Sequence, residues 1–289
     1  MVVFLTKPRL VQMTKGNAMN ASLQSELRPG PVAIILNEDG VELESTVRHC
    51  RTIGFPNVLV AGASGGSTNG AINVIADPSL GLSATLSPLI TALTGRWIYY
   101  GYNAEYLYFP FCEDRTIADA AQFVDEERRK SVFSTVVDLY ARELETNPLG
   151  IDLDAPLFDK SGYFSQRRHD GSDYLDRQFH VYGGLKWRFA EHVPWGHQRI
   201  ERISFFRAEH GLTIDDRGVL SDPEMNTLTS PWHNSMTFAV ASFRVAKSLR
   251  RNPGSLDHIR DFSWSQSEPF SWRSDHLMER GFMEPGQWF

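Results

Sequence analysis

The sequence is poor in cysteine and has neither a long hydrophobic run nor an excess of basic residues. Its two cysteines, Cys50 and Cys112, lie far apart and match no CxxC or paired spacing, so we expect both thiols to stay reduced. No segment approaches the roughly 18 uninterrupted apolar residues of a membrane span. The apolar start MVVFL is soon interrupted by Lys7, Pro8 and Arg9, a pattern too short for a signal peptide. We predict a cytoplasmic protein, and peripheral attachment to a membrane stays open as an alternative.

The charge and composition are those of an ordinary folded protein. The chain has 29 Lys and Arg against 35 Asp and Glu, a formal net charge of −6, which disfavours a surface built to attract nucleic acid. Hydrophobic residues make up 42% of the chain and aromatic residues 12%, so a disordered chain is excluded. A length of 289 residues allows one large α/β domain or two smaller ones. We predict an extension over 1–30 and one domain over 31–289, with halves at 31–143 and 144–289.

The first elements of the domain follow a β-loop-α-β pattern. The run VAIIL at 32–36 is typical of a strand buried in a parallel sheet, and the following Asn-Glu-Asp-Gly breaks it. Apolar residues at helical spacing predict a helix over 41–54, which Gly54 ends. NVLVAG at 57–62 is the next strand. Because such a unit is right-handed and parallel, its ligand crevice should lie beyond the carboxyl ends of the strands.

The rest of the chain continues the alternation of helices and strands. The tail is too rich in Trp and Phe to be a solvated linker. Pro, Asp, Gly and Ser throughout 144–180 predict a long functional loop region. The alternation in GGLKWRF predicts a strand that places Lys186 and Arg188 on one face. The patterns predict helices over 89–95, 116–130 and 236–251, and strands over 96–102, 131–141, 183–190 and 201–208.

One motif suggests a short-chain dehydrogenase that uses NAD(P). VLVAGASGGSTNG has the outline of a strand and glycine-rich turn that holds a pyrophosphate, and Tyr182 and Lys186 form a Tyr-x-x-x-Lys pair. That pair needs one helical face, but Gly183 and Gly184 lie between its members, and each costs roughly 1 kcal/mol in a helix interior. Thr68 also stands where a glycine is needed for close helix packing. We keep this function as the less favoured alternative.

An ordered set of segments resembles glycosyltransferase family 2. The segments, from about residue 31 to the end, are ILNEDGVELESTVRHCRTIGFPNVLVAG, YNAEYLYFPFCEDRTI, VVDLY, PLFDKSGYF, GGLKWRF and FSWRSDHLMERGFM. The resemblance implies a GT-A fold, a Rossmann-like and mostly parallel α/β sheet flanked by helices, with an acceptor-side extension at the C-terminus. It further implies that the protein binds a nucleotide-sugar.

The resemblance also implies a nucleotide site whose metal ligands are replaced. Asn37 and Glu38 match the loop that lies against the nucleotide, and Ser64 is what remains of an acidic motif after the second strand. At the third strand Tyr102 and Ala104 stand where the family has its two metal-binding aspartates, and Tyr102 joins Asn37, Glu38 and Ser64 as a candidate for nucleotide binding. A divalent ion held by oxygen ligands offsets the diphosphate charge. We therefore predict no metal site and no cofactor, so that cationic side chains replace the ion or the transfer reaction is lost.

Two carboxylates are the candidates for catalysis. Glu105, which the family motif keeps, is predicted to orient the donor or to position the acceptor, and its alternative is a surface glutamate. Asp138 in VVDLY matches a family position beside the acceptor, and an inverting transfer needs one carboxylate to take the proton of the acceptor hydroxyl. Sugar rings are candidate ligands for Trp187, Trp195 and Trp232, although buried packing is the default for such residues.

Three cationic residues are the candidates for phosphate binding. Lys186 and Arg188 are predicted to contact a diphosphate together, with a solvated sheet face as the alternative. His233 in SPWHNS matches a family histidine near the phosphates, and a capping or core role is its alternative.

These assignments predict an inverting, metal-independent glycosyltransferase. It would move a sugar from a nucleotide-sugar to a saccharide or related acceptor, as in the synthesis of cell-surface polysaccharide. The alternative from another class is a GT-A-fold protein that no longer catalyses and serves as a binding or scaffolding subunit.

Overall fold

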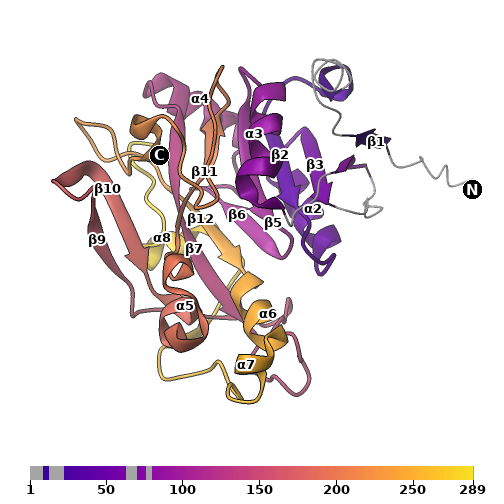
Figure 1. Cartoon of the computed structure of the whole chain (residues 1–289), viewed down its shortest axis with the longest axis vertical. Helices are drawn as coiled ribbons and strands as arrows, with labels where there is room; N and C mark the ends of the chain where they lie inside the picture. The colour runs from indigo at the N-terminus through magenta and orange to yellow at the C-terminus, as the bar shows by residue number, and fades with distance from the viewer. Residues whose placement is uncertain (1–8, 13–22, 63–69, 76–79, 289) are drawn as a thin grey trace, which may run out of the picture. The chain divides into compact units, whose positions relative to one another are not determined.

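The computed structural model describes residues 9–12, 23–62, 70–75 and 80–288, which form two compact units (Figure 1). Unit 1 comprises the described residues up to 104 together with 114–132 and 203–226. Unit 2 comprises residues 105–113, 133–202 and 227–288. The prediction of one domain with halves at 31–143 and 144–289 stays a prediction.

Unit 1 is an α/β unit with a mostly parallel sheet. Its parallel strands lie in the order β1-β4-β3-β2-β5, and residues 205–207 of β11 pair antiparallel with β5. β2 and β3 are buried along their whole length, as expected for strands covered on both faces. The strands are β1 (Arg9–Gln12), β2 (Val32–Leu36), β3 (Asn57–Gly62), β4 (Ile72–Ile75), β5 (Trp97–Tyr102) and β11 (Glu201–Arg207).

The helices α2 (Leu43–Thr52), α3 (Leu82–Ala92) and α4 (Ile117–Glu126) accompany this sheet. α2 packs on β2 and β3 through one buried stripe that includes Leu43, Val47 and Cys50. α4 begins with a capping box, because Thr116 and Asp119 each accept a hydrogen bond from the other's backbone amide. The helices predicted over 41–54 and 116–130 are therefore confirmed, with slightly shorter bounds.

Unit 2 is built on β7, β12 and β6. β12 pairs parallel with β7 and antiparallel with β6, while β8 pairs antiparallel with β7 and β13. β9 and β10 form a separate antiparallel pair. The strands are β6 (Glu105–Tyr108), β7 (Ser131–Tyr140), β8 (Leu157–Asp159), β9 (Phe164–His169), β10 (Tyr174–Tyr182), β12 (Phe238–Ser242) and β13 (Ser267–Pro269). The helices are α5 (Gly184–Arg188), α6 (Arg244–Arg251), α7 (Pro253–Leu256) and α8 (Ser274–Glu279).

Three sequence predictions in unit 2 are wrong. The segment GGLKWRF is the helix α5 and not a strand, so Lys186 and Arg188 do not alternate along a sheet face. The helix predicted over 236–251 is a strand, β12, followed by the shorter helix α6. The short apolar run FAVAS has no periodicity that separates a buried strand from a helix. The region 144–180, predicted as loop, contains β8, β9 and most of β10.

Other predictions agree with the structure. The strands predicted at 32–36, 57–62, 96–102, 131–141 and 201–208 are confirmed as β2, β3, β5, β7 and β11. The aromatic tail packs into unit 2, where Phe270, Phe282 and Trp288 are buried. Across the described ranges, no helix is both long and apolar enough to span a membrane.

Candidate functional site

Three of the four predicted nucleotide-binding residues lie at the carboxyl edge of the parallel sheet in unit 1. Leu36 at the end of β2 is the register partner of Tyr102 at the end of β5, and Asn37 and Glu38 follow Leu36 directly. The amide of Asn37 donates to the carbonyl of Ala61 in β3 across 2.8 Å. This edge is where parallel α/β sheets hold their ligands. Ser64, the fourth candidate, lies outside the described residues, and the nucleotide role of all four stays a prediction.

The side chain of Asn103 holds the loop after β2 in place. Asn103 is fully buried, and its Oδ1 accepts a 2.9 Å hydrogen bond from the amide of Glu38. Its Nδ2 donates to the carbonyl of Val41 across 2.8 Å and also to the carboxylate of Asp39. Sequence reasoning missed this residue, although an Asn directly after a predicted strand end is a signal for such a role.

Both carboxylates chosen from the sequence lie in one row across the sheet of unit 2. Ser242 is the register partner of Asp138 in the pairing of β12 with β7 and of Glu105 in the pairing of β12 with β6. Because neighbouring strands lie about 4.8 Å apart, the strands of Asp138 and Glu105 are separated by about 10 Å. Asp138 is 1% exposed and Glu105 is 2% exposed.

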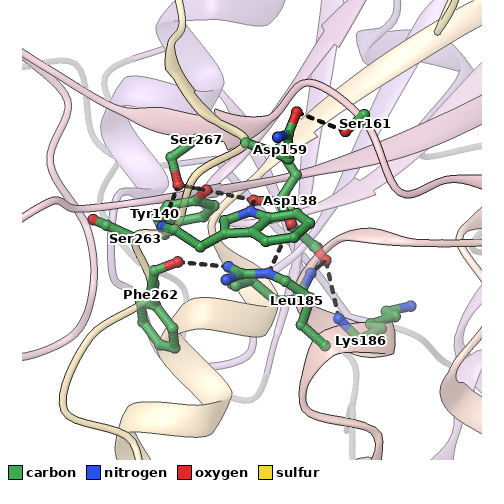
Figure 2. Close-up of polar contacts among 12 residues, drawn as sticks. Asp138, Tyr140, Asp159, Ser161, Leu185, Lys186, Phe262, Ser263 and Ser267 are labelled. Carbon is green, nitrogen blue, oxygen red and sulfur yellow. Dashed lines mark hydrogen bonds and ion pairs between the residues drawn. The ribbon is translucent and has the colours of Figure 1, made fainter.

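Asp138 is held by the first turn of α5. Its Oδ2 accepts hydrogen bonds from the amides of Leu185 at 2.9 Å and Lys186 at 3.4 Å, as Figure 2 shows. Burial raises the pKa of Asp138 from 3.8 to about 7, although Lys186 and these amide hydrogen bonds oppose the rise. Within the described part of the chain, Oδ1 of Asp138 is buried without a hydrogen-bond partner. A carboxylate in this state is suited to accept a proton near neutral pH.

Two glycines make the contact with Asp138 possible: Gly183 directly before α5, and Gly184 as its first residue. Gly184 has φ +62, and a Cβ there would lie 2.7 Å from Oδ2 of Asp138. Gly183 has φ +153, and a Cβ there would clash with Cδ1 of Tyr163. The same segment disfavours the dehydrogenase alternative, because Tyr182 ends the strand β10 while Lys186 lies in the helix α5. The Tyr and Lys of that motif do not share a helix.

Lys186 is a half-buried cation beside Asp138. Its Nζ donates a 2.7 Å hydrogen bond to the carbonyl of Arg199. Burial lowers the pKa of Lys186 from 10.5 to about 8, Asp138 and Glu105 oppose this shift, and Arg202 and Arg244 add to it. The structure therefore brings three predicted site residues, Asp138, Lys186 and Glu105, into one electrostatic cluster of unit 2.

Glu105 is engaged in an ion pair within this cluster. Its Oε2 lies 2.7 Å from Nη2 of Arg202, and its Oε1 accepts a 3.1 Å hydrogen bond from Ser242. Both side chains of the pair are largely buried, with 3% of Glu105 and 11% of Arg202 exposed. Glu105 is therefore not a surface glutamate, and its position favours a role in holding β6, β11 and β12.

Arg188 belongs to a second polar group next to Asp138. Its Nε lies 2.8 Å from Oδ2 of Asp159, and its Nη2 donates to the carbonyl of Phe262 across 2.6 Å. Oδ1 of Asp159 accepts hydrogen bonds from the hydroxyl of Tyr140 and from Nε1 of Trp264 (Figure 2). The negative charge of Asp159 in turn helps to raise the pKa of Asp138. The contacts of Arg188 favour a structural role over phosphate binding.

His233 lies in a surface turn of unit 2. Its Nδ1 is 3.1 Å from the hydroxyl of Ser230, and its ring is near that of Trp232, with centroids 6.3 Å apart. Among the described residues, no three or more His, Cys, Asp or Glu side chains come together as a metal site.

Comparison of the sequence with known proteins assigns the chain to no family. A scan against protein-family models found no match, and a search of curated proteins found no similar sequence.

Proposed function

We propose that the protein is a GT-A-like glycosyltransferase that moves a sugar from a nucleotide-sugar to a saccharide acceptor with inversion and without a divalent metal. Asp138 is the general base that takes the proton of the acceptor hydroxyl. Lys186 provides a positive charge beside this base. The acceptor is a growing cell-surface polysaccharide or a related saccharide.

The state of Asp138 carries this proposal. Inversion by direct displacement needs one carboxylate that can take a proton as the acceptor oxygen attacks the sugar carbon, and a base works best when its pKa is near the operating pH. Asp138 is buried, its pKa is raised to about 7, and Oδ1 is not used by another group in the described chain. The positive charge of Lys186 lowers the pKa of Asp138 and so counteracts part of the effect of burial. It therefore keeps part of the Asp138 population ionised.

The sheet edge of unit 1 supports the donor half of the proposal. Parallel strands that end together at Leu36 and Tyr102 provide a ligand edge, and the loop at 37–41 is fixed there by Asn103. A fixed loop loses little conformational entropy on binding, which favours recognition of a nucleotide.

Calorimetry with UDP-, GDP- and dTDP-sugars tests donor binding, and a transfer or hydrolysis assay tests catalysis. We expect one nucleotide class to bind, and we expect Mn²⁺ and EDTA to leave binding and turnover unchanged. The Asp138→Asn variant should bind the donor as the wild type does while its turnover falls about 10²-fold or more. Absence of nucleotide binding across the three classes would contradict the proposal.

The ion pair of Glu105 favours a second candidate, a GT-A-like binding protein without catalysis. Glu105 is the acid that the family motif keeps, and here Arg202 and Ser242 occupy both of its oxygens. This candidate predicts donor binding with no turnover in the wild type, and no further loss in Asp138→Asn.

A further inference from the structure

A hollow of about 410 Å³ lies on unit 2 beside β10. This volume falls within the range of about 300–1,000 Å³ that is usual for small-molecule sites. The residues that shape it come from β10 and from the segment 229–234. They include Asp176, Arg177, Thr229, Trp232, His233 and Asn234.

Arg177 fixes the two walls of the hollow to each other. Its Nη1 donates a 2.6 Å hydrogen bond to the carbonyl of Thr229, and its own carbonyl accepts one of 2.9 Å from the amide of Leu228. The backbone of Arg177 has φ 52, in the left-handed region that residues other than glycine rarely adopt. Strain of this kind persists where the surrounding structure imposes it, and it concentrates at ligand sites.

Trp232 is exposed to solvent, and it lies on a turn that hydrogen bonds between its own residues hold in place. Its side chain is 70% exposed. The hydroxyl of Ser230 bonds both Nδ1 and the carbonyl of His233 at 3.1 Å, and the amide of Ser230 donates to Ser235 Oγ across 3.0 Å. These bonds close the turn around Trp232, so the ring is presented to solvent by a defined backbone. Its apolar face is available for stacking.

The charges of the hollow cancel. The carboxylate of Asp176 lies 2.7 Å from Nε of Arg177, so a phosphate would meet a carboxylate and an organic cation would meet a guanidinium. Asp176, Thr229 and Asn234 together offer hydrogen-bond donors and acceptors in a small space. Hydroxyl groups, which donate and accept, match this lining, and the C–H face of a sugar ring matches the indole.

We propose that this hollow binds a pyranose ring of a neutral saccharide, with Trp232 against the ring face and Asp176 and Asn234 on its hydroxyls. His233 then shapes a sugar subsite and does not bind a phosphate. The inference rests on the proposed function only for the statement that the saccharide is the acceptor. Saccharide binding itself requires no donor.

Titration of the full chain with maltotetraose, cellotetraose and mannotetraose, without any nucleotide, tests the inference by calorimetry and by the NMR signal of the Trp232 indole. We expect one of them to bind and to shift that signal. Trp232→Ala should weaken binding about tenfold, equivalent to about 1.4 kcal/mol. Tyr174→Ala is the matched control, because it removes an aromatic ring that is 56% exposed but does not line the hollow, and it should change affinity less than about twofold.

Three results would overturn the inference. They are no binding of any of these saccharides at about 10 mM, equal weakening by the Trp232 and Tyr174 variants, and displacement of the saccharide by inorganic phosphate. If the nucleotide-sugars fail to bind while a saccharide binds through Trp232, the proposed glycosyltransferase fails and the saccharide site stands.

Discussion

The backbone amide of Leu185 donates a 2.9 Å hydrogen bond to Oδ2 of Asp138, a residue 47 positions earlier in the chain. This contact depends on Gly184, whose φ of +62 and missing Cβ let the chain turn directly over the carboxylate. A hydrogen bond to the buried carboxylate of Asp138 thus joins the first turn of α5 to the end of β7.

Gly184→Ala should destabilise the protein by roughly 1–3 kcal/mol, because alanine is strained at this φ and its Cβ would lie 2.7 Å from Oδ2 of Asp138. Urea unfolding measures the loss. Gly281→Ala is the control, since Gly281 has φ +74 but no atom within 4 Å of the place that an alanine Cβ would take, and it should cost about 1 kcal/mol. Equal losses in the two variants would show that backbone strain alone, and not the approach to Asp138, explains the glycine.

The raised pKa of Asp138 predicts a specific dependence of stability on pH. A carboxyl whose pKa rises from 3.8 in the unfolded chain to about 7 in the folded one contributes stability below pH 3.8, and that stability is lost as the pH rises to about 7. The side-chain amide of the Asp138→Asn variant cannot ionise, so the variant lacks this dependence. The free energy of unfolding of the wild type should therefore fall relative to Asp138→Asn between about pH 4 and 7, by up to ~4 kcal/mol.

Urea unfolding at half-unit steps of pH measures this difference. Asp257→Asn, at an exposed position after α7, is the control and should give a curve parallel to the wild type. A constant difference between the wild type and Asp138→Asn across this range would mean that Asp138 stays ionised in the folded protein, and the case for it as a base near neutral pH would fail.

The parallel strands of unit 1 could be predicted from the sequence because their signals are local. VAIIL and NVLVAG are short β-branched runs, and the helix between them has its own apolar stripe. The predictions at 183–190 and 236–251 are wrong because the local pattern there is ambiguous. In GGLKWRF the alternation of side chains suggests a strand, but positive φ at Gly183 and Gly184 turns the chain into α5.

The candidate site was predictable only in part. Glu105 and Asp138 were chosen because they match family positions, and Lys186 because of its place on a predicted strand, and the three do share a cluster. Arg202 could not be assigned to Glu105, because a pairing across 97 residues depends on which strands meet. Asn103 was missed because its importance lies in three hydrogen bonds to a loop more than 60 residues away in the sequence.

The buried pair of Glu105 and Arg202 should show strong coupling. Arg202→Met removes a cation that lies 2.7 Å from a carboxylate that is 3% exposed, and it should cost about 3 kcal/mol, while the double variant with Glu105→Gln should recover part of that loss. A double-mutant cycle by urea unfolding measures the coupling. The exposed pair of Lys130 and Glu209 is the control, and Lys130→Met should cost less than about 1 kcal/mol. Additive losses at Glu105 and Arg202 would exclude a structural ion pair.

Asn103→Ala should loosen the loop that follows β2. The variant removes the acceptor of the Glu38 amide and the donor to Val41, so we expect a loss of about 2 kcal/mol in stability and faster hydrogen exchange at the amide of Glu38. If the loop binds the donor, nucleotide affinity should fall as well, because binding must then order the loop. Asn147→Ala, which removes only local hydrogen bonds to Glu143 and Thr146, is the control and should leave both measurements unchanged. Unchanged protection of the Glu38 amide in Asn103→Ala would contradict the anchoring role, whereas faster exchange with unchanged nucleotide affinity would separate loop anchoring from donor binding.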